Sequence, residues 1–366
     1  MKIESAICRH TGKLAIETVD LEEPRENEIL VRTIATGICH TDISVMNQVL
    51  PAPLPIALGH EGAGIVEKIG AKVTNVAVGD HVVMTYDYCG TCPSCLAGKQ
   101  TYCHNSFDYC FGGHRPDGSS PISKDGEAVG GSFFGQSSLA TYSICYDRNV
   151  VKVRKDAPLE LLGPLACGIQ TGAGAVLNAL KVEKGSDFAV FGAGAVGLSA
   201  IMAAKIAGAR RIIAVDVAPE RLALAKELGA TDIINGATDD ILEIIASLTE
   251  GGVMFALDTS GVPTVMQQAV MALAPRGTCG WLAGVSPDLN ITVNPLFLLY
   301  GRSIRGIIEG DAHDASAFIN KLIDWHMEGK FPFDKLIKTY PFSDLDTAIA
   351  DSKSGSAIKP IVVFDT

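Results

Sequence analysis

A glycine-rich turn between an apolar strand and an apolar helix constrains the fold of this chain more than any other feature. The stretch "SDFAVFGAGAVGLSAIMAAKIAGARRIIAVDV" reads as strand, turn, helix and strand. Three further stretches, "PERLALAKELGATDII", "GGVMFALDTSG" and "GTCGWLAGV", continue the alternation. Strands that alternate with helices are joined by right-handed crossovers and therefore run parallel. The sequence predicts a doubly wound parallel sheet after Cys167.

The glycines of this turn have the spacing of a dinucleotide-binding site. Gly192, Gly194 and Gly197 form G-x-G-x-x-G, which allows a tight turn, a close approach to a pyrophosphate, and close packing of helix and strand. The free N–H groups at the helix start favour phosphate. Asp216 ends the next strand, nineteen residues after Gly197, where a carboxylate binds a ribose 2′-OH and repels a 2′-phosphate. We therefore predict NAD over NADP, although Arg221 could accept a phosphate; the alternative is a glycine turn with an ordinary strand-end Asp.

The rest of the chain has a different character. The first 150 residues are rich in Gly, Pro and Val, and "EILVRTIATGIC" and "GAGIVEKIG" read as strands. Near the end, "DASAFINKLIDWHMEGKF" predicts an amphipathic helix and "IKPIVVF" a closing strand. We expect two domains, the first mostly β, and composition alone does not assign the C-terminal segment to either.

Charge and hydropathy narrow the partners and the location. The 366 residues include 30 basic and 41 acidic side chains, a formal net charge of −11. This balance argues against nucleic acid or an anionic membrane as the main partner. No apolar run has signal-peptide or membrane-spanning length. We expect a cytoplasmic protein without a membrane span.

Four closely spaced cysteines predict a structural metal site. Cys89, Cys92, Cys95 and Cys103 have the spacing C-x-x-C-x-x-C-x7-C. Four thiolates close a tetrahedron around zinc and leave no position for substrate. An iron–sulfur cluster and disulfides are the alternatives, and disulfides are disfavoured in a cytosolic protein.

Four dispersed residues predict a second, catalytic zinc. Cys39, His60 and Cys167 supply two thiolates and one imidazole, a set that leaves the fourth position for water or substrate, and Glu61 follows His60. Each residue taken alone is more commonly structural. Their joint occurrence with the cysteine group and the dinucleotide turn favours a metal site.

These motifs together resemble one enzyme family. "GICHTD", "LGHEGAGIVEKIG", the four cysteines, "ACGIQTGAGAVLNAL" and "GAGAVG" are similar to the zinc-dependent medium-chain alcohol dehydrogenases over essentially the whole chain. "CHTDISVMNQVLPAPLPIALGHEGAG" and "FGGHRPDGSSP" resemble its aryl-alcohol (benzyl alcohol) branch, some relatives of which act on allylic terpene alcohols. The resemblance implies an α/β fold with two domains. These are a mostly β, GroES-like catalytic domain over 1–167, completed by 306–366, and a Rossmann NAD-binding domain over 168–305.

The resemblance also implies roles for individual residues. Cys39, His60 and Cys167 would hold the catalytic zinc, with Glu61 as an occasional alternative ligand and Asp42 orienting His60. Thr41 would hydrogen-bond the alcohol oxygen and pass its proton outward. Around the cofactor, three more residues are implied: Thr171 and Val196 at the nicotinamide, and His40 near the pyrophosphate. The family usually forms homodimers, and tetramers are possible.

One departure from the family concerns proton transfer. Many relatives have a histidine five residues after the first zinc cysteine, where this chain has Ser44. A serine does not accept a proton to become a cation at neutral pH, so the relay would end in water or in another residue such as His40.

The leading hypothesis is oxidation of an aryl or allylic primary alcohol to its aldehyde, with NAD as hydride acceptor and two zinc ions per chain. The segment from Ile43 to Leu54 is largely apolar, which favours such substrates over polyols. Two alternatives stay open. The same machinery could act on aliphatic alcohols or polyols, or the chain could bind zinc and nucleotide without turnover.

Overall fold

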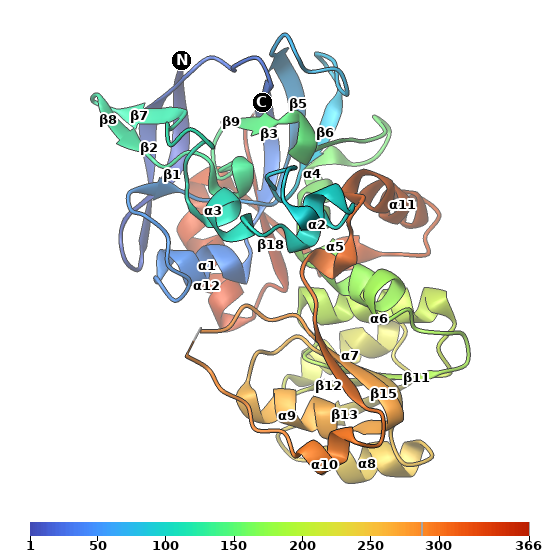
Figure 1. Ribbon diagram of the computed structural model, residues 1–366. Helices are drawn as coiled ribbons and strands as arrows, with labels where there is room; N and C mark the ends of the chain where they lie inside the picture. The colour runs from blue at the N-terminus through green and yellow to red at the C-terminus, as the bar shows by residue number, and fades with distance from the viewer. Residues whose placement is uncertain (287, 366) are drawn as a thin grey trace. The chain divides into compact units, whose positions relative to one another are not determined.

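The computed structural model describes residues 1–286 and 288–365. Its contacts divide the chain into two compact units, shown with the chain coloured from end to end in Figure 1. Unit 1 comprises Met1–Cys167, His313–Met327 and Asp334–Thr366, and unit 2 comprises Gly168–Ala312 and Glu328–Phe333. The predicted limits differ at the return of the chain. Residues 306–312 and 328–333 belong to unit 2, and Gly310 packs so tightly on Gly174 of unit 2 that a Cβ on Gly174 would lie 2.3 Å from the Gly310 carbonyl oxygen.

Unit 1 is built on two sheets. The first has the order β4-β1-β2-β7-β8, and the second has the order β10-β6-β5-β3-β18-β17 with β9 also paired to β3. The first sheet contains β1 (Lys2–His10), β2 (Lys13–Leu21), β4 (Ile56–Ala57), β7 (Ile122–Lys124) and β8 (Glu127–Val129). The second contains β3 (Glu28–Gly37), β5 (Gly62–Ile69), β6 (His81–Met84), β9 (Tyr142–Tyr146), β10 (Val150–Lys152), β17 (Ile337–Pro341) and β18 (Lys359–Val363). The C-terminal segment therefore completes unit 1, because β18 pairs antiparallel with β3.

The helices of unit 1 are short in its N-terminal part and longer in the returning segment. They are α1 (His40–Met46), α2 (Pro93–Leu96), α3 (Ser106–Phe111), α4 (Leu159–Leu162), α11 (Ala315–Met327) and α12 (Leu345–Ser354). The amphipathic helix predicted from the sequence corresponds to α11, which buries Phe318, Ile319, Leu322 and Ile323 on one face.

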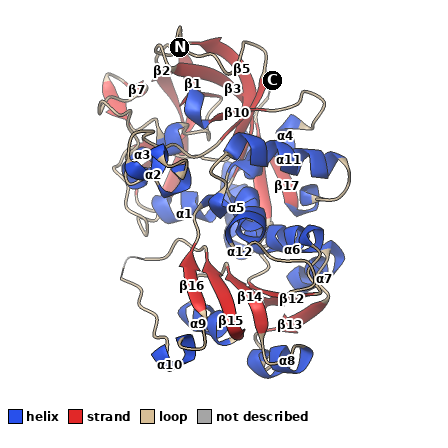
Figure 2. Cartoon of the chain, turned by 45° about the vertical axis from the view of Figure 1, so that its right-hand side comes forward, coloured by secondary structure: helices blue, strands red, loops and turns tan. Residues whose placement is uncertain are grey.

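Unit 2 is the predicted doubly wound domain. Its sheet has the order β13-β12-β11-β14-β15-β16, and every neighbouring pair is parallel. The strands are β11 (Asp187–Phe191), β12 (Arg211–Asp216), β13 (Asp232–Asn235), β14 (Val253–Asp258), β15 (Leu273–Trp281) and β16 (Ser303–Gly306). The helices, coloured blue in Figure 2, are α5 (Gly168–Gly174), α6 (Ala195–Ala207), α7 (Pro219–Leu228), α8 (Ile241–Leu248), α9 (Pro263–Met271) and α10 (Pro295–Leu298). The order reverses between β11 and β14, which is where such sheets bind ligands.

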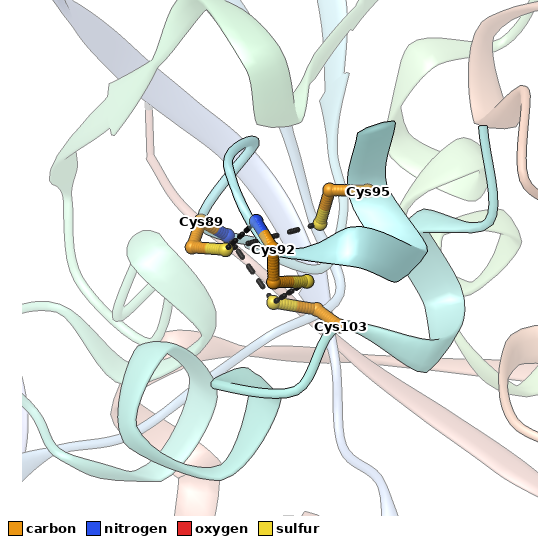
Figure 3. A group of neighbouring side chains, drawn as sticks. All are labelled: Cys89, Cys92, Cys95 and Cys103. Carbon is orange, nitrogen blue, oxygen red and sulfur yellow. Dashed lines mark hydrogen bonds between the residues drawn. The ribbon is translucent and has the colours of Figure 1, made fainter. Parts of the chain in front are cut away.

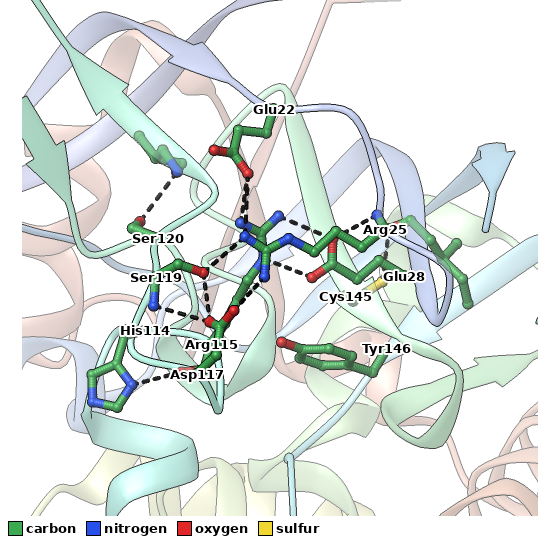
Figure 4. Close-up of polar contacts among 12 residues, drawn as sticks. Glu22, Arg25, Glu28, His114, Arg115, Asp117, Ser119, Ser120, Cys145 and Tyr146 are labelled. Carbon is green, nitrogen blue, oxygen red and sulfur yellow. Dashed lines mark hydrogen bonds and ion pairs between the residues drawn. The ribbon is translucent and has the colours of Figure 1, made fainter. Parts of the chain in front are cut away.

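A buried arginine fixes the loop that follows α3 (Figure 4). The Arg115 guanidinium donates to both carboxylate oxygens of Glu28, at 2.6 and 3.0 Å, and to Glu22 at 2.6 Å. Arg115 is 2% exposed and Glu28 is 1% exposed, so the pair lies inside the protein. Because Glu28 begins β3, this ion pair ties the "FGGHRPDGSSP" loop to the central strand of the second sheet.

None of the helices within residues 1–286 and 288–365 has the length and apolar character needed to cross a membrane.

Candidate functional site

The structure brings the four dispersed ligand candidates together in unit 1. One donor atom from each of Cys39, His60, Glu61 and Cys167 lies within 4.8 Å of the others. Cys39 directly precedes α1, His60 and Glu61 directly precede β5, and Cys167 ends the N-terminal part of unit 1. Residues 128 positions apart thus meet because β3 and β5 are neighbours and the segment before Cys167 packs on them.

Asp42 holds the imidazole of His60 in place. Its Oδ1 lies 3.0 Å from His60 Nδ1 and also accepts from the Gly59 N–H, while Oδ2 accepts from the Cys39 N–H at 3.0 Å. As the third residue of α1, Asp42 is well placed to bind the free N–H groups at the helix start. Two segments that carry ligand candidates are therefore fixed by one buried carboxylate.

The donor set fits zinc. His60 Nε2 is buried and has no hydrogen-bond partner among the residues that the structure describes, as expected of an imidazole whose other nitrogen is oriented by a carboxylate so that this one binds a metal. A hydrogen bond with Cys167 and the charge of Lys359 hold the pKa of Cys39 well below its usual value despite burial, which favours the thiolate that a metal binds.

Glu61 is held by a lysine that the sequence analysis did not single out. Lys359 Nζ lies 2.8 and 3.0 Å from the two carboxylate oxygens of Glu61, and both residues are buried. Burial raises the pKa of Glu61 to about 7, although the lysine charge lowers it. The backbone of Gly37 also lies close to the Glu61 carboxylate, since a Cβ on Gly37 would lie 2.0 Å from Glu61 Oε2.

Aromatic rings enclose His60. The Phe134 ring stacks on the imidazole with centroids 4.6 Å apart, and the Phe133 ring meets it edge-on at 5.6 Å. These residues were also missed, and the only signal for them was the paired "FF" before the glycine at 135. The two phenyl rings restrict the orientation of the His60 imidazole, whose Nδ1 is held by Asp42.

Thr41, His40 and Ser44 all lie on α1. The Thr41 hydroxyl oxygen is 3.8 Å from Cys39 Sγ, which places it beside the ligand group. His40 is the first residue of the helix and is exposed, whereas Ser44 is partly buried.

The apolar segment after Cys39 divides into core and surface. Ile43 and Met46 are buried in the same apolar cluster as Ile56 and Phe133. Leu50 and Leu54 are only partly buried and pack against this cluster, and Pro51 is exposed.

The cysteine group is a second ligand set in unit 1 (Figure 3). The sulfur atoms of Cys89 and Cys95 are 3.9 Å apart, and those of Cys92 and Cys103 are 4.0 Å apart. Zinc–sulfur bonds of 2.3 Å in a tetrahedron put the sulfurs about 3.8 Å apart, whereas a disulfide requires about 2 Å. All four cysteines are free thiols, so the disulfide alternative is excluded here.

Backbone N–H groups surround these sulfurs. Cys89 Sγ accepts from the N–H groups of Thr91 and Cys92, at 3.4 and 3.3 Å, and Cys103 Sγ accepts from Cys89 and Asn105, each at 3.4 Å. Burial opposes ionisation, but these donors lower the pKa of Cys89 to about 5. Burial raises the pKa of Cys103, so the backbone donors favour a negatively charged sulfur at Cys89 in particular, one of the thiolates that zinc binding requires.

The glycine turn lies in unit 2 between β11 and α6. Gly192 has φ +100°, and a Cβ on Gly197 would lie 1.8 Å from the Gly192 carbonyl oxygen, so both positions require glycine. Gly194 precedes α6, and a Cβ there would meet no atom within 4 Å, which leaves space above the helix N-terminus. This arrangement suits the close approach of a phosphate.

Asp216 ends β12 beside this turn. Its Oδ2 accepts from the Ala193 N–H at 2.6 Å and its Oδ1 from the Ala218 N–H at 2.9 Å. Arg221 lies in the first turn of α7, which begins three residues after Asp216.

The two residues assigned to the nicotinamide lie on adjoining helices of unit 2. Thr171 is on α5 and Val196 is on α6, and these helices approach so closely that a Cβ on Gly172 would lie 2.0 Å from the Val196 carbonyl oxygen. The Thr171 hydroxyl lies 3.4 Å from Glu309 Oε2.

Comparison with known proteins places both units in one family. The alcohol dehydrogenase GroES-like domain matches residues 25–155, and the zinc-binding dehydrogenase family matches residues 195–325. A geraniol dehydrogenase from Castellaniella defragrans is 42% identical over 365 residues, which cover 99% of this chain and 97% of that protein.

Two solved structures agree with these matches along the whole chain. The crystal structure of benzyl alcohol dehydrogenase from Acinetobacter calcoaceticus has 44% identity and a TM-score of 0.96, and that of an alcohol dehydrogenase zinc-binding domain protein from Burkholderia ambifaria has 49% identity and a TM-score of 0.98. Each comparison covers 100% of both chains. The chain therefore belongs to the zinc-dependent medium-chain alcohol dehydrogenase family.

Proposed function

We propose that this protein oxidises aromatic or allylic primary alcohols reversibly to their aldehydes, with NAD as hydride acceptor. The observation that carries the proposal is the meeting of Cys39, His60, Glu61 and Cys167 within 4.8 Å, in a chain with relatives named geraniol dehydrogenase and benzyl alcohol dehydrogenase. Geraniol and benzyl alcohol are both primary alcohols in which the carbinol carbon is attached to an unsaturated carbon.

Two zinc ions per chain belong to the proposal. Cys39, His60 and Cys167 would hold the catalytic ion, with Glu61 retained by Lys359, and the four cysteines of residues 89–103 would hold the structural one. When bound, the catalytic zinc supplies a Lewis acid for the alcohol oxygen, and NAD accepts the hydride. The chain's own residues then have to orient the alcohol and remove its proton.

Thr41 is the residue we assign to the proton. Its hydroxyl lies beside Cys39 and would accept the hydrogen bond of the alcohol O–H, then donate its own proton outward. The oxidised alcohol thus loses a hydride to NAD and a proton to solvent. Because Ser44 does not become a cation, we propose that the exposed imidazole of His40, at the start of α1, takes this proton from Thr41 and releases it to solvent.

The glycine turn would bind the nucleotide. Amide groups at the start of α6 would bind the pyrophosphate. Each carboxylate oxygen of Asp216 accepts one hydrogen bond from a backbone N–H and keeps a second lone pair, with which it would accept from the adenosine ribose hydroxyls. The negative charge of Asp216 would disfavour the 2′-phosphate of NADP. Thr171 and Val196 would contact the nicotinamide.

Conjugation is the chemical reason for the substrate class. An aryl or allylic group stabilises the positive character that develops at carbon as hydride leaves, so these alcohols react more readily. Leu50 and Leu54, partly buried on an apolar cluster, offer apolar surface for a ring or an isoprenoid chain. Burial of such a group contributes about 25 cal/mol per Å².

The test is a comparison of kcat/KM for benzyl alcohol, geraniol, ethanol and sorbitol, with saturating NAD and in parallel with NADP, on protein of known zinc content. We expect benzyl alcohol or geraniol to lead, NAD to be preferred, and two zinc ions per chain. Ethanol or sorbitol in the lead would overturn the substrate class, and a preference for NADP would overturn the role of Asp216. Zinc-loaded protein without any turnover would support the non-catalytic alternative.

A further inference from the structure

A threonine directly after strand β14 packs against the glycine turn. Thr259 follows β14, and its hydroxyl oxygen lies 3.1 Å from the carbonyl oxygens of both Phe191 and Gly192. Its backbone N–H donates to Phe191 at 2.9 Å. The contact is close, because a Cβ on Gly192 would lie 2.5 Å from the Thr259 hydroxyl oxygen.

The Gly192–Ala193 peptide is held at both of its polar ends. Its carbonyl oxygen is bound by Thr259 from the β14 side, and its N–H donates to Asp216 Oδ2 at 2.6 Å from the β12 side. A peptide unit is planar, so fixing the direction of the carbonyl also fixes the direction of the N–H. The Thr259 hydroxyl and the Asp216 carboxylate are therefore linked through one rigid group.

The same carbonyl has little room to rotate. A Cβ on Gly197 would lie 1.8 Å from the Gly192 oxygen and 3.3 Å from the Thr259 hydroxyl oxygen, so this oxygen is pressed against the first turn of α6. Loss of the Thr259 hydroxyl would leave the oxygen without its donor in this confined space. The peptide would then keep only one of the two hydrogen bonds that fix its polar ends, and a small shift of the peptide would also shift the carboxylate bound to its N–H.

We propose that Thr259 is a positioning residue for the nucleotide, acting through the Gly192–Ala193 peptide on the carboxylate of Asp216. This inference rests on the proposed dinucleotide site, in which Asp216 and the turn contact the nucleotide and Thr259 does not. Thr259 thereby contributes both to the affinity for NADH and to the discrimination against NADPH.

The experiment compares two substitutions that differ in the hydroxyl. Thr259→Val keeps the shape and removes the donor, whereas Thr259→Ser keeps the donor. Dissociation constants of NADH and NADPH are measured by fluorescence titration of the purified full chain, with thermal midpoints recorded for each variant. We expect Thr259→Val to weaken NADH binding roughly threefold to tenfold, the range of one hydrogen bond, and to lower the preference for NADH over NADPH. Thr259→Ser should stay within about twofold of the wild type.

A double-mutant cycle tests the route through Asp216. In an Asp216→Ala background the peptide N–H has lost the carboxylate, so Thr259→Val should then weaken NADH binding by less than about twofold. A structural role alone would give the same cost in both backgrounds. Should Thr259→Val fail to fold, Thr259→Ala enters the same comparison.

Three results would overturn the inference alone: wild-type NADH affinity in Thr259→Val, an equal loss in Thr259→Ser, or an undiminished cost in the Asp216→Ala background. Wild-type protein that binds neither nucleotide would overturn the proposed function and, with it, this inference. The two failures are therefore distinguishable.

Discussion

Lys359 and Glu61 form an ion pair with almost no access to solvent, at 3% and 0% exposure. Such a pair gives little net stability, because both charges lose their hydration when the chain folds. Removing one partner is far more costly, since the remaining charge is left buried without compensation. Replacement of either residue alone should therefore destabilise the protein more than replacement of both.

Thus Lys359→Met should lower the free energy of unfolding by about 3–5 kcal/mol, measured by urea denaturation. Lys359→Met combined with Glu61→Gln should recover part of this loss. The matched control is Lys338→Met on the neighbouring strand β17, which breaks an exposed pair with Asp351 of α12 and should cost less than about 1 kcal/mol. A Lys359→Met loss no larger than that of the control would contradict the prediction.

Thr41 permits a second test at single residues. Thr41→Val removes the hydroxyl beside Cys39 and should cut kcat by roughly two to four decades, the contribution of general acid–base catalysis, while the NADH dissociation constant stays near that of the wild type. Thr41→Ser keeps the hydroxyl and should retain most of the turnover. Near-normal turnover in Thr41→Val would mean that the alcohol proton leaves by another route.

At the scale of elements, the segment of residues 89–103 has hardly any regular structure of its own. Its helix α2 has four residues, and the three buried cysteines Cys92, Cys95 and Cys103 form its main apolar cluster. A helix of this length is unstable alone. We therefore expect the order of the segment to come from its sulfur atoms and from the zinc that we propose they bind.

Cys95→Ser should accordingly lower the zinc content from two ions per chain toward one and reduce the thermal midpoint, because metal binding and folding of such a segment are coupled. Cys110→Ser is the control, since Cys110 is a buried thiol near this segment that donates to the Asp87 carbonyl and belongs to neither ligand set. Zinc analysis together with calorimetry provides the measurement. Cys95→Ser protein that retains two zinc ions and a normal midpoint would argue against a structural metal here.

Helices and strands were predictable from the sequence where the hydrophobic pattern that specifies them lies within one short segment. The alternating strands and helices of residues 187–281 follow from hydrophobic period and glycine placement, and the parallel order of the sheet agrees with that prediction. Lys359 was not predictable, because its partner Glu61 lies 298 positions away and only the pairing of β18 with β3 brings them together. The burial of Ile43 and Met46 in a core cluster was not predictable for a related reason: an apolar residue on a short helix does not reveal which cluster it joins.

At the scale of the whole molecule, the two metal-ligand sets both belong to unit 1, and the glycine turn belongs to unit 2. The limits of these units depend on the path of the returning chain, which crosses from unit 2 to unit 1 after Ala312 and revisits unit 2 over Glu328–Phe333. No periodicity in the sequence marks either crossing. The predicted boundary at residue 306 therefore lies before the crossing at Ala312, and the return to unit 2 over Glu328–Phe333 was not predicted.

This division predicts how the molecule responds when the zinc ions that we propose for unit 1 are removed. Prolonged treatment with a chelator should raise backbone hydrogen exchange most in peptides from residues 28–167, which contain all eight ligand candidates, because metal binding stabilises only the unit that supplies the ligands. Peptides from residues 187–258, which form β11 to β14, should change far less, and NADH should protect these peptides instead. The measurement is exchange mass spectrometry of the full chain with zinc, without zinc and with NADH. Equal loss of protection in both units on chelation would show that the metals stabilise the molecule as one cooperative body.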